Sequence, residues 1–430
     1  MSDNHFYQSN KNFLKVENVI PLGSQTFSKS YLQYPRGISP LFAKNAKGSK
    51  LWDIDGNRFI DLVNSLAAVT LGYRNNKVDG AVRRQLRKGV IYSLPDKLEY
   101  EVAEKICYLV PSAEMVRFGK NGTDATSAAV RIARAYTGRS HVAICGYHGW
   151  QDWSIGITTR NKGVPTEVSN LSHPFSFNDI KSLESIFELY TNNVAAVILE
   201  PMNVAFPEDE FLQKVRALTQ KHGSLLIFDE TITGFRMSEG GAQEYFGVTP
   251  DLTTLGKGIA NGYPLSAVVG KKEFMCEMKE IFFSGTFGGE LLSLAAANKV
   301  LEMHIQKEIV PDLVRIGNKI ATQTQSLIER NGLTEVLSLG GHDSWKILVW
   351  KSVSNYDTNV LRTLFLQEMI AQGVLIIGSH NVSTSISDRD ISRILASYEV
   401  VLSMISESIK NNSVLQKLKT EPLKQLFKIR

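Results

Sequence analysis

The chain has 430 residues, a length that favours two domains over one, and a formal net charge of +5 at neutral pH. Its tail from Lys410 onward contains six basic residues and one acidic residue, so the tail supplies the whole excess and the body is neutral. A neutral body lacks the basic surface that nucleic-acid binding requires. The tail is expected to be a solvated helix, and an amphipathic helix that contacts a membrane is the alternative.

The N-terminal segment MSDNHFYQSNKNF is polar and lacks the apolar core of a signal peptide. No apolar run along the chain reaches the ~18 residues that a membrane-spanning helix needs. The three cysteines, Cys107, Cys145 and Cys276, lie far apart without metal-ligand spacing, so we expect no metal site and a reducing cytosol. These features predict a cytoplasmic protein.

In chain order, the first structural signal is KLWDIDGNRFIDL, which predicts a β-hairpin that turns at Asp55-Gly56. From residue 76 to 307, helical stretches alternate with apolar runs, which are HVAICG from His141, VAAVILE from Val194, SLLIFDE from Ser224 and LSAVVG from Leu265. Strands that are apolar throughout are typical of a parallel sheet covered by helices on both faces. This region therefore predicts a large α/β domain with a mostly parallel sheet.

The pattern changes after Pro311. It predicts helices over about 312–331, over 359–372 and from Ser387-Asp388 onward, with strands WKILVW at Trp345 and VLII at Val374. Such a mixture indicates a smaller α+β domain. The predicted division is an N-terminal segment, 1–75, that joins the small domain, a large domain, 76–307, and a C-terminal small domain, 308–430.

Asn121, Gly122 and Thr123 come immediately before a predicted helix that ends near Gly138. Free backbone N–H groups at a helix start, together with a threonine hydroxyl, form a suitable seat for a phosphate. Ordinary N-capping by Thr123 or Asp124 explains the same residues about as well. Neither GxGxxG nor a Walker sequence occurs, so this seat is not a nucleotide fingerprint.

Further polar residues follow the ends of predicted strands, where ligands bind in open α/β sheets. In CGYHGWQDW, the Tyr147 ring is suited to stacking on a planar cofactor and His148 to titration near neutrality, unless these rings only fill a cleft between domains. Asp229 ends the apolar run LLIF, where a buried carboxylate needs a cation or hydrogen-bond donors. Lys257 lies among glycines in LGKGIANGYP, and a solvated surface lysine is the ordinary alternative.

A phosphate seat, a stacking ring, a strand-end aspartate and a lysine in a glycine-rich turn are together what pyridoxal 5'-phosphate (PLP) requires. Asp229 would keep the pyridine nitrogen protonated, and Lys257 would form the Schiff base with the aldehyde carbon. The motifs WDIDGNRFIDL, NGTDA, YHG, DETITGFR, LGKG and GTFGGE resemble those of the class III aminotransferases of fold type I over nearly the whole chain. The resemblance implies a large domain on a mostly parallel, seven-stranded type of sheet and a smaller α+β domain.

The resemblance assigns further residues. Thr231 would pack beside the cofactor ring, and Thr286 of SGTFGGE would reach across a dimer interface to the partner's phosphate, which implies a homodimer with shared active sites. The family usually has a serine at the position of Asn121 and a glutamate at that of Asp124. Both differences are small, so the phosphate seat is still expected.

Within the family, the chain is similar to the glutamate-1-semialdehyde aminomutases but departs from them. Lys29 stands where they have an arginine for the substrate carboxylate, Gly378 where they have a glutamate, and GTFGGE replaces GTxxGNP. The stretches GSQTFSKS, GYHGWQDW and GSHN resemble instead a branch found with carbohydrate biosynthesis. The candidate substrate-binding residues, for which solvated loops are the alternative, are Lys29, Ser93, His148, Trp150, His342, Ser379, His380 and Asn381.

Three functions stay open. An aminotransferase would move nitrogen, most simply from glutamate, to the terminal aldehyde of a sugar acid, with an oxidised 3-deoxy-octulosonate of lipopolysaccharide biosynthesis as the expected substrate. An aminomutase would move nitrogen within glutamate-1-semialdehyde. A cofactor-binding regulator without catalysis is disfavoured because Lys257 and Asp229 are both retained.

Overall fold

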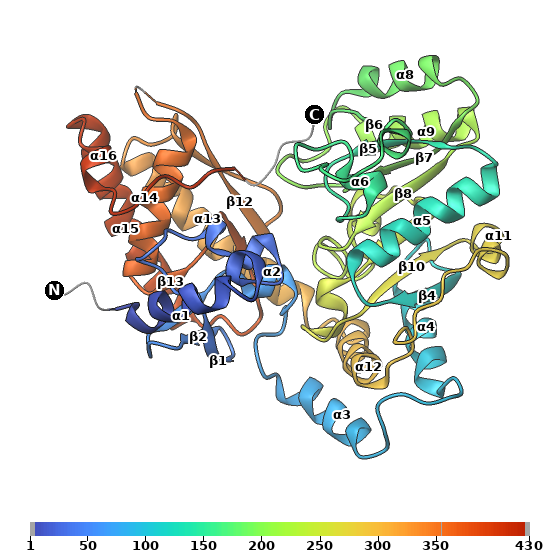
Figure 1. Cartoon of the computed structure of the whole chain (residues 1–430), viewed down its shortest axis with the longest axis horizontal. Helices are drawn as coiled ribbons and strands as arrows, with labels where there is room; N and C mark the ends of the chain where they lie inside the picture. Colours follow the sequence, from blue (N-terminus) through green and yellow to red (C-terminus); the bar gives the residue numbers. More distant parts are fainter. Residues whose placement is uncertain (1–4, 354, 426–430) are drawn as a thin grey trace. The chain divides into compact units, whose positions relative to one another are not determined.

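The structure is a computed structural model that describes residues 5–353 and 355–425. The chain divides into two compact units (Figure 1), a small one of Met1–Asn75 with Asp312–Leu426 and a large one of Asn76–Pro311. The last part of the predicted C-terminal tail, 426–430, lies outside the described residues. The predicted domain boundary between 307 and 308 falls in the turn just before α13 (Val310–Arg330).

The large unit is built on one seven-stranded sheet, in the order β4-β10-β9-β8-β7-β5-β6. The strands from β9 to β6 pair in parallel, as the apolar runs predict. Their bounds are β4 (Met115–Gly119), β5 (His141–Cys145), β6 (Ser172–Pro174), β7 (Val194–Leu199), β8 (Leu225–Glu230), β9 (Leu252–Leu255) and β10 (Ser266–Gly270).

Strand β10 is the exception, since it runs antiparallel to both β9 and β4. Only a short segment with the 3-10 helix η4 (Lys257–Ala260) joins β9 to β10. A parallel return needs a crossover of about a dozen residues or more, usually with an α-helix. The mostly parallel sheet predicted from LSAVVG and its neighbours therefore has one reversed strand, and the short segment before it carries Lys257.

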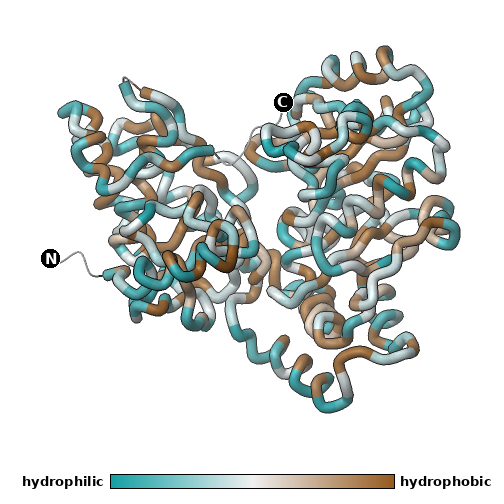
Figure 2. Tube along the Cα trace, viewed as in Figure 1, coloured by the Kyte–Doolittle hydropathy of each residue, from teal (hydrophilic) through white to brown (hydrophobic). Residues whose placement is uncertain are grey.

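Two hydrophobic layers explain why the central strands are apolar throughout. Ile198 of β7 and Ile227 of β8 pack on one face, in a cluster with α5 (Gly122–Thr137). The alternate residues Leu199 and Phe228 pack on the other face, against α8 (Ile180–Leu189) and α9 (Phe211–His222). Figure 2 shows this hydrophobic interior under more hydrophilic outer turns.

Two further helices of the large unit, α3 (Asn76–Leu86) and α4 (Lys97–Leu109), pack on α12 (Leu291–Ile305). Its shorter helical turns are α6 (Asp152–Ile155), α7 (Thr166–Ser169), α10 (Ala242–Phe246), α11 (Lys272–Met275) and η5 (Cys276–Lys279). Among the described residues, no helix combines the length and the apolar character needed to cross a membrane.

The small unit contains two sheets, in the orders β1-β2-β3-β13 and β11-β12-β14. The predicted hairpin is present as β2 and β3, and its turn uses Gly56 at a φ of +89°, a region that favours glycine. The strands are β1 (Ala43–Lys47), β2 (Lys50–Asp53), β3 (Arg58–Asp61), β11 (Leu337–Gly340), β12 (Trp345–Trp350), β13 (Val374–Leu375) and β14 (Ser379–Asn381). Its helices include α1 (Tyr7–Glu17), α13, α14 (Thr358–Ala371), α15 (Asp388–Lys410) and α16 (Val414–Lys417).

A strained turn follows β3. All four residues of α2 (Asn64–Ala67) have left-handed φ values, of 43°, 50°, 61° and 66° in chain order. This conformation costs an L-residue about 1–2 kcal/mol. The carboxylate of Asp61 holds the start of the turn by accepting the backbone N–H of Val63 at 2.7 Å and that of Asn64 at 3.0 Å.

Candidate active site

The start of α5 offers a free hydroxyl next to free backbone N–H groups. The Asp124 carboxylate caps the helix by accepting the N–H groups of Lys120 at 2.9 Å and Asn121 at 2.8 Å. Thr123 is buried, and its Oγ1 has no hydrogen-bond partner. The capping alternative therefore applies to Asp124 and not to Thr123. A buried, unpaired hydroxyl at a helix N-terminus is suited to an anion such as a phosphate.

The loop after β5 is fixed to this helix start. Thr126 Oγ1 donates to the backbone carbonyl of His148 at 2.7 Å. Gly149 has a φ of +115°, and a Cβ at this position would lie 2.3 Å from Thr123 Oγ1. Only glycine allows so close an approach, so the loop packs directly on the candidate phosphate seat.

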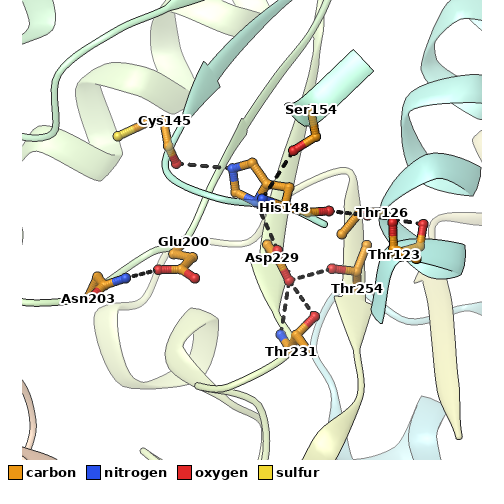
Figure 3. Close-up of polar contacts among 10 residues, drawn as sticks. All are labelled: Thr123, Thr126, Cys145, His148, Ser154, Glu200, Asn203, Asp229, Thr231 and Thr254. Carbon is orange, nitrogen blue, oxygen red and sulfur yellow. Dashed lines mark hydrogen bonds and ion pairs between the residues drawn. The ribbon is translucent and has the colours of Figure 1, made fainter. Parts of the chain in front are cut away.

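Asp229 lies at the end of β8 and is the centre of the site (Figure 3). It is 5% exposed, and its Oδ2 is 2.8 Å from Nδ1 of His148. Its Oδ1 accepts the N–H of Thr231 at 3.1 Å, the hydroxyl of Thr231 at 2.5 Å and the hydroxyl of Thr254 at 2.9 Å. Burial acts to raise the pKa of Asp229, but these hydrogen bonds outweigh it and hold the pKa below its ordinary value. The carboxylate is therefore kept ionised.

His148 places both ring nitrogens against acceptors. Nδ1 faces the Asp229 carboxylate, and Nε2 is 3.1 Å from the backbone carbonyl of Cys145. These two contacts fix the orientation of the ring against Asp229. The ring is 2% exposed and lies parallel to that of Trp153, with centroids 6.4 Å apart. The ring thus positions Asp229, and contact of His148 with substrate stays a prediction.

Thr231 connects the phosphate seat to the lysine turn. A Cβ added at Gly122 would lie 3.0 Å from the Thr231 methyl group, and one added at Gly256 would lie 3.2 Å from the same methyl. Lys257 follows at once, with a φ of 43° that is unusual for any residue other than glycine. Backbone strain of this kind is concentrated at functional sites. The turn thus brings Lys257 to the part of the site that holds Thr123 and Asp229.

The environment of Lys257 changes its titration. Burial, with a smaller contribution from the charge of Arg236, lowers the pKa of Lys257 to about 8, although the carboxylates of Glu200 and Asp229 act to raise it. A lysine that titrates near neutrality can both accept and donate protons under physiological conditions.

Glu200 is a site residue that the sequence analysis missed. It directly follows β7, as Asp229 ends β8, and its carboxylate accepts the side-chain amide of Asn203. Burial, with a smaller contribution from the charge of Asp229, raises the pKa of Glu200 to about 7. The signal was present in VAAVILE, since a carboxylate after an apolar strand is the same feature that singled out Asp229.

The remaining predicted residues of the large unit lie closer to solvent. Tyr147 is 44% exposed, and burial together with the charge of Asp229 raises the pKa of its phenol. Trp150 is 66% exposed, and Ser93 and Thr286 are also exposed. Contact of these residues with cofactor, substrate or a partner subunit stays a prediction.

The substrate candidates of the small unit differ in exposure. Lys29 is exposed in the 3-10 helix η2 (Phe27–Lys29), whereas His342 is buried, with Nδ1 2.9 Å from Ser344 Oγ. His380 is also buried, and its Nε2 is 2.6 Å from Tyr398 Oη. Burial lowers the pKa of His380 to about 4, so the ring is neutral. Its Nδ1 has no hydrogen-bond partner, and contact of His380 with substrate stays a prediction.

The site geometry defines an enzyme of the PLP type. An unpaired Thr123 hydroxyl for a phosphate, an ionised Asp229 for a protonated ring nitrogen and the amine of Lys257 all belong to one edge of one sheet. These groups fit the phosphate, the pyridinium and the aldehyde of PLP.

Comparison with known proteins gives the family. Residues 33–395 match the family model "Aminotransferase class-III". A glutamate-1-semialdehyde 2,1-aminomutase of Persephonella marina is 36% identical over 387 residues, which cover 84% of this chain and 90% of the relative. A 3-aminobutyryl-CoA aminotransferase of Cloacimonas acidaminovorans is 36% identical over 75% of this chain and 78% of the relative. The PLP internal aldimine form of the FumI protein of Sphingopyxis sp. MTA144 superposes with a TM-score of 0.88 at 25% identity, covering 97% of this chain and 99% of that one.

The chain therefore belongs to the class III aminotransferases, a family of PLP-dependent enzymes. The predictions of fold type I, of a PLP-dependent transaminase class and of PLP as cofactor are confirmed at this level.

Proposed function

We propose that the chain transfers an amino group with Lys257 as its acid–base residue and Asp229 as the partner of the cofactor's ring nitrogen. Bound PLP supplies an electron sink for the substrate carbon that loses its proton. Thr123 and the N–H groups at the start of α5 would bind the phosphate, and the ionised Asp229 would hold a proton on the ring nitrogen. Lys257 would hold the cofactor and move the substrate's proton. The observation that carries the proposal is the buried Asp229, fixed by four hydrogen bonds.

The relatives favour an intramolecular reaction. Glutamate-1-semialdehyde 2,1-aminomutases match at 36% identity over most of this chain, so rearrangement of glutamate-1-semialdehyde is the first candidate. This was the alternative in the sequence analysis. The 3-aminobutyryl-CoA aminotransferase matches at the same identity, which supports transfer between two molecules as a competing reaction.

The second candidate is the sugar-acid aminotransferase, with glutamate and an oxidised 3-deoxy-octulosonate giving 8-amino-3,8-dideoxy-manno-octulosonate. It is favoured by Lys29, whose ammonium lacks the bidentate fork of an arginine for a small substrate's carboxylate, and by Gly378 in place of a glutamate. Both ring nitrogens of His148 already face acceptors of the protein, which weakens one of the contacts that suggested a hydroxylated ligand.

One pair of assays separates the candidates. The purified enzyme is given glutamate-1-semialdehyde alone, and 5-aminolevulinate is measured; in parallel it is given the 8-amino sugar acid with 2-oxoglutarate, and glutamate is measured. Product in the first assay alone supports the aminomutase, and product in the second alone supports the sugar aminotransferase. Lys257→Ala is expected to abolish turnover in whichever assay is positive and to remove the visible absorbance of enzyme-bound PLP. Turnover by Lys257→Ala would contradict the assignment of this residue.

A homodimer with Thr286 at the partner's phosphate, and a cytoplasmic location, belong to the same proposal. Active sites are then expected only in the dimer, and a fully active monomer at high dilution would contradict the shared site.

A further inference from the structure

A hollow of about 380 Å³ lies in the small unit and includes none of the residues assigned above. Its walls come from β2, β3, the turn after α14 and the first turns of α15. Four of its lining side chains are cationic, namely Lys50, Arg58, Arg389 and Arg393, and one is acidic, Asp390. The hollow therefore gathers positive charge from three parts of the sequence.

The acid in the hollow is already paired. Asp390 forms an ion pair with Lys50 and accepts the hydroxyl of Ser49 at 2.8 Å. Within 5–353 and 355–425, no ion pair involves Arg58, Arg389 or Arg393. Among the described residues, the three guanidinium groups make one weak hydrogen bond in the wall, from Arg393 to the carbonyl of Gln372 at 3.4 Å. The three guanidinium groups, all of exposed residues, thus line one hollow whose single lining carboxylate, Asp390, is paired with Lys50.

The positions of two of these arginines oppose the rules of helix stability. Arg389 and Arg393 are four residues apart on α15, where like charges repel. Arg389 also lies in the first turn, where the helix dipole favours anions over cations. Local rules are broken in this way mainly at functional sites, where a ligand compensates the cost.

A second cavity adjoins the cationic one. It has a volume of about 600 Å³ and shares Arg58, Gln372, Gly373 and Arg393 with the first hollow. Its other lining side chains are apolar (Phe6, Ile38, Phe59, Ile370 and Ala371) and polar (His5, Asn57, Gln367 and Lys419). Together the two cavities have the size of a site for a small organic molecule, with a cationic end and an end of mixed polarity.

We propose that these cavities bind a phosphate ester, with the phosphate among Arg58, Arg389 and Arg393 and the organic part in the second cavity, against Phe6, Ile38, Phe59 and Ile370. A phosphate monoester presents three terminal oxygens and close to two negative charges, which suits three guanidinium groups better than a single carboxylate does. Arginine is the residue that matches such oxygens with paired N–H donors. This site would be separate from the cofactor's phosphate seat and does not depend on the proposed reaction.

The test is a binding titration of the full-length holoenzyme with phenyl phosphate, at constant ionic strength and with the cofactor seat saturated by PLP. Saturable binding at one site per chain is expected, with weaker binding of inorganic phosphate and of phenol, which are the two halves of the ester. The double variant Arg389→Gln with Arg393→Gln should weaken binding at least tenfold. Arg330→Gln, an exposed arginine of α13 outside the hollow, is the matched control and should bind as the wild type does.

The melting temperature and the PLP absorbance of each variant show whether it is folded, and Arg58→Gln on β3 repeats the test from a different element. Loss of binding in the hollow variants alone supports the site. Absence of saturable binding, or equal binding in wild type and hollow variants, would overturn it. Equal affinity for inorganic phosphate and phenyl phosphate would overturn the assignment to an organic ester.

Discussion

Replacing His148 by alanine removes the hydrogen bond that fixes Oδ2 of Asp229, at 2.8 Å in a site where the carboxylate is 5% exposed. A hydrogen bond to a charged group contributes about 1.5–3 kcal/mol, and a factor of ten in rate corresponds to about 1.4 kcal/mol. Because the bond supports the ionised Asp229, which is proposed to hold the ring-nitrogen proton, we expect the single-turnover reaction with substrate to slow by about 10- to 150-fold. His148→Asn, which keeps an N–H donor, should lie between alanine and wild type.

The assay is a single-turnover reaction followed by the absorbance of the bound cofactor, with PLP affinity titrated separately for each variant. Ser154→Ala is the control, since Ser154 accepts only the backbone N–H of His148, at 3.3 Å, and does not touch Asp229. A wild-type rate and PLP affinity in His148→Ala would refute this reasoning. So would an equal loss in Ser154→Ala, because the loop and not the Asp229 bond would then be responsible.

Three further predictions concern the titration of the site and the strain of the fold. In cofactor-free protein, carbamoylation of Lys257 by cyanate, followed by peptide mass spectrometry, should reach half its maximal rate at about pH 8, since only the neutral amine reacts; a midpoint above pH 10 would contradict the buried environment. The pKa of Glu200 in the folded protein is raised to about 7, so above that pH the buried, ionised carboxylate destabilises the fold in full. This destabilisation disappears as the pH falls toward the ordinary carboxyl pKa. Glu200→Gln should therefore raise the melting temperature more at pH 8 than at pH 5. Ser65→Gly should raise the melting temperature, because it removes about 1 kcal/mol of backbone strain at a left-handed residue. Ser238→Gly, at a position without positive φ, should not raise it. An unchanged melting temperature in Ser65→Gly would show that the turn is not strained.

Local patterns predicted the parts of the site that lie within single elements. The apolar run ending at Asp229 and the small polar residues before α5 both reflect short-range rules, since a strand must end at the sheet edge and a helix must begin with free N–H groups. Lys257 was found in the same way, from glycines that allow a tight turn.

Contacts between distant residues could not be predicted from one sequence. His148 and Asp229 are 81 positions apart, and only the strand order brings them together. The burial of His380 depends on which face of β14 turns inward, and that follows from its contact with Tyr398 on α15. The direction of β10 follows from the short connection after β9, and an apolar run such as LSAVVG has the same pattern in a parallel and in an antiparallel strand.

The small unit is discontinuous along the chain, and this governs its assembly during synthesis. Strand β3 completes its sheet with β13, pairing Ile60 with Val374 and Asp61 with Leu375. At a translation rate of about 5–20 residues per second, roughly 300 intervening residues take about 15–60 seconds to emerge. The large unit, uninterrupted from Asn76 to Pro311, can fold during that interval. During that time β3 has no partner on the edge that later pairs with β13, and such an exposed strand edge is prone to aggregation. The large unit, which contains Lys257, can fold before this edge is paired.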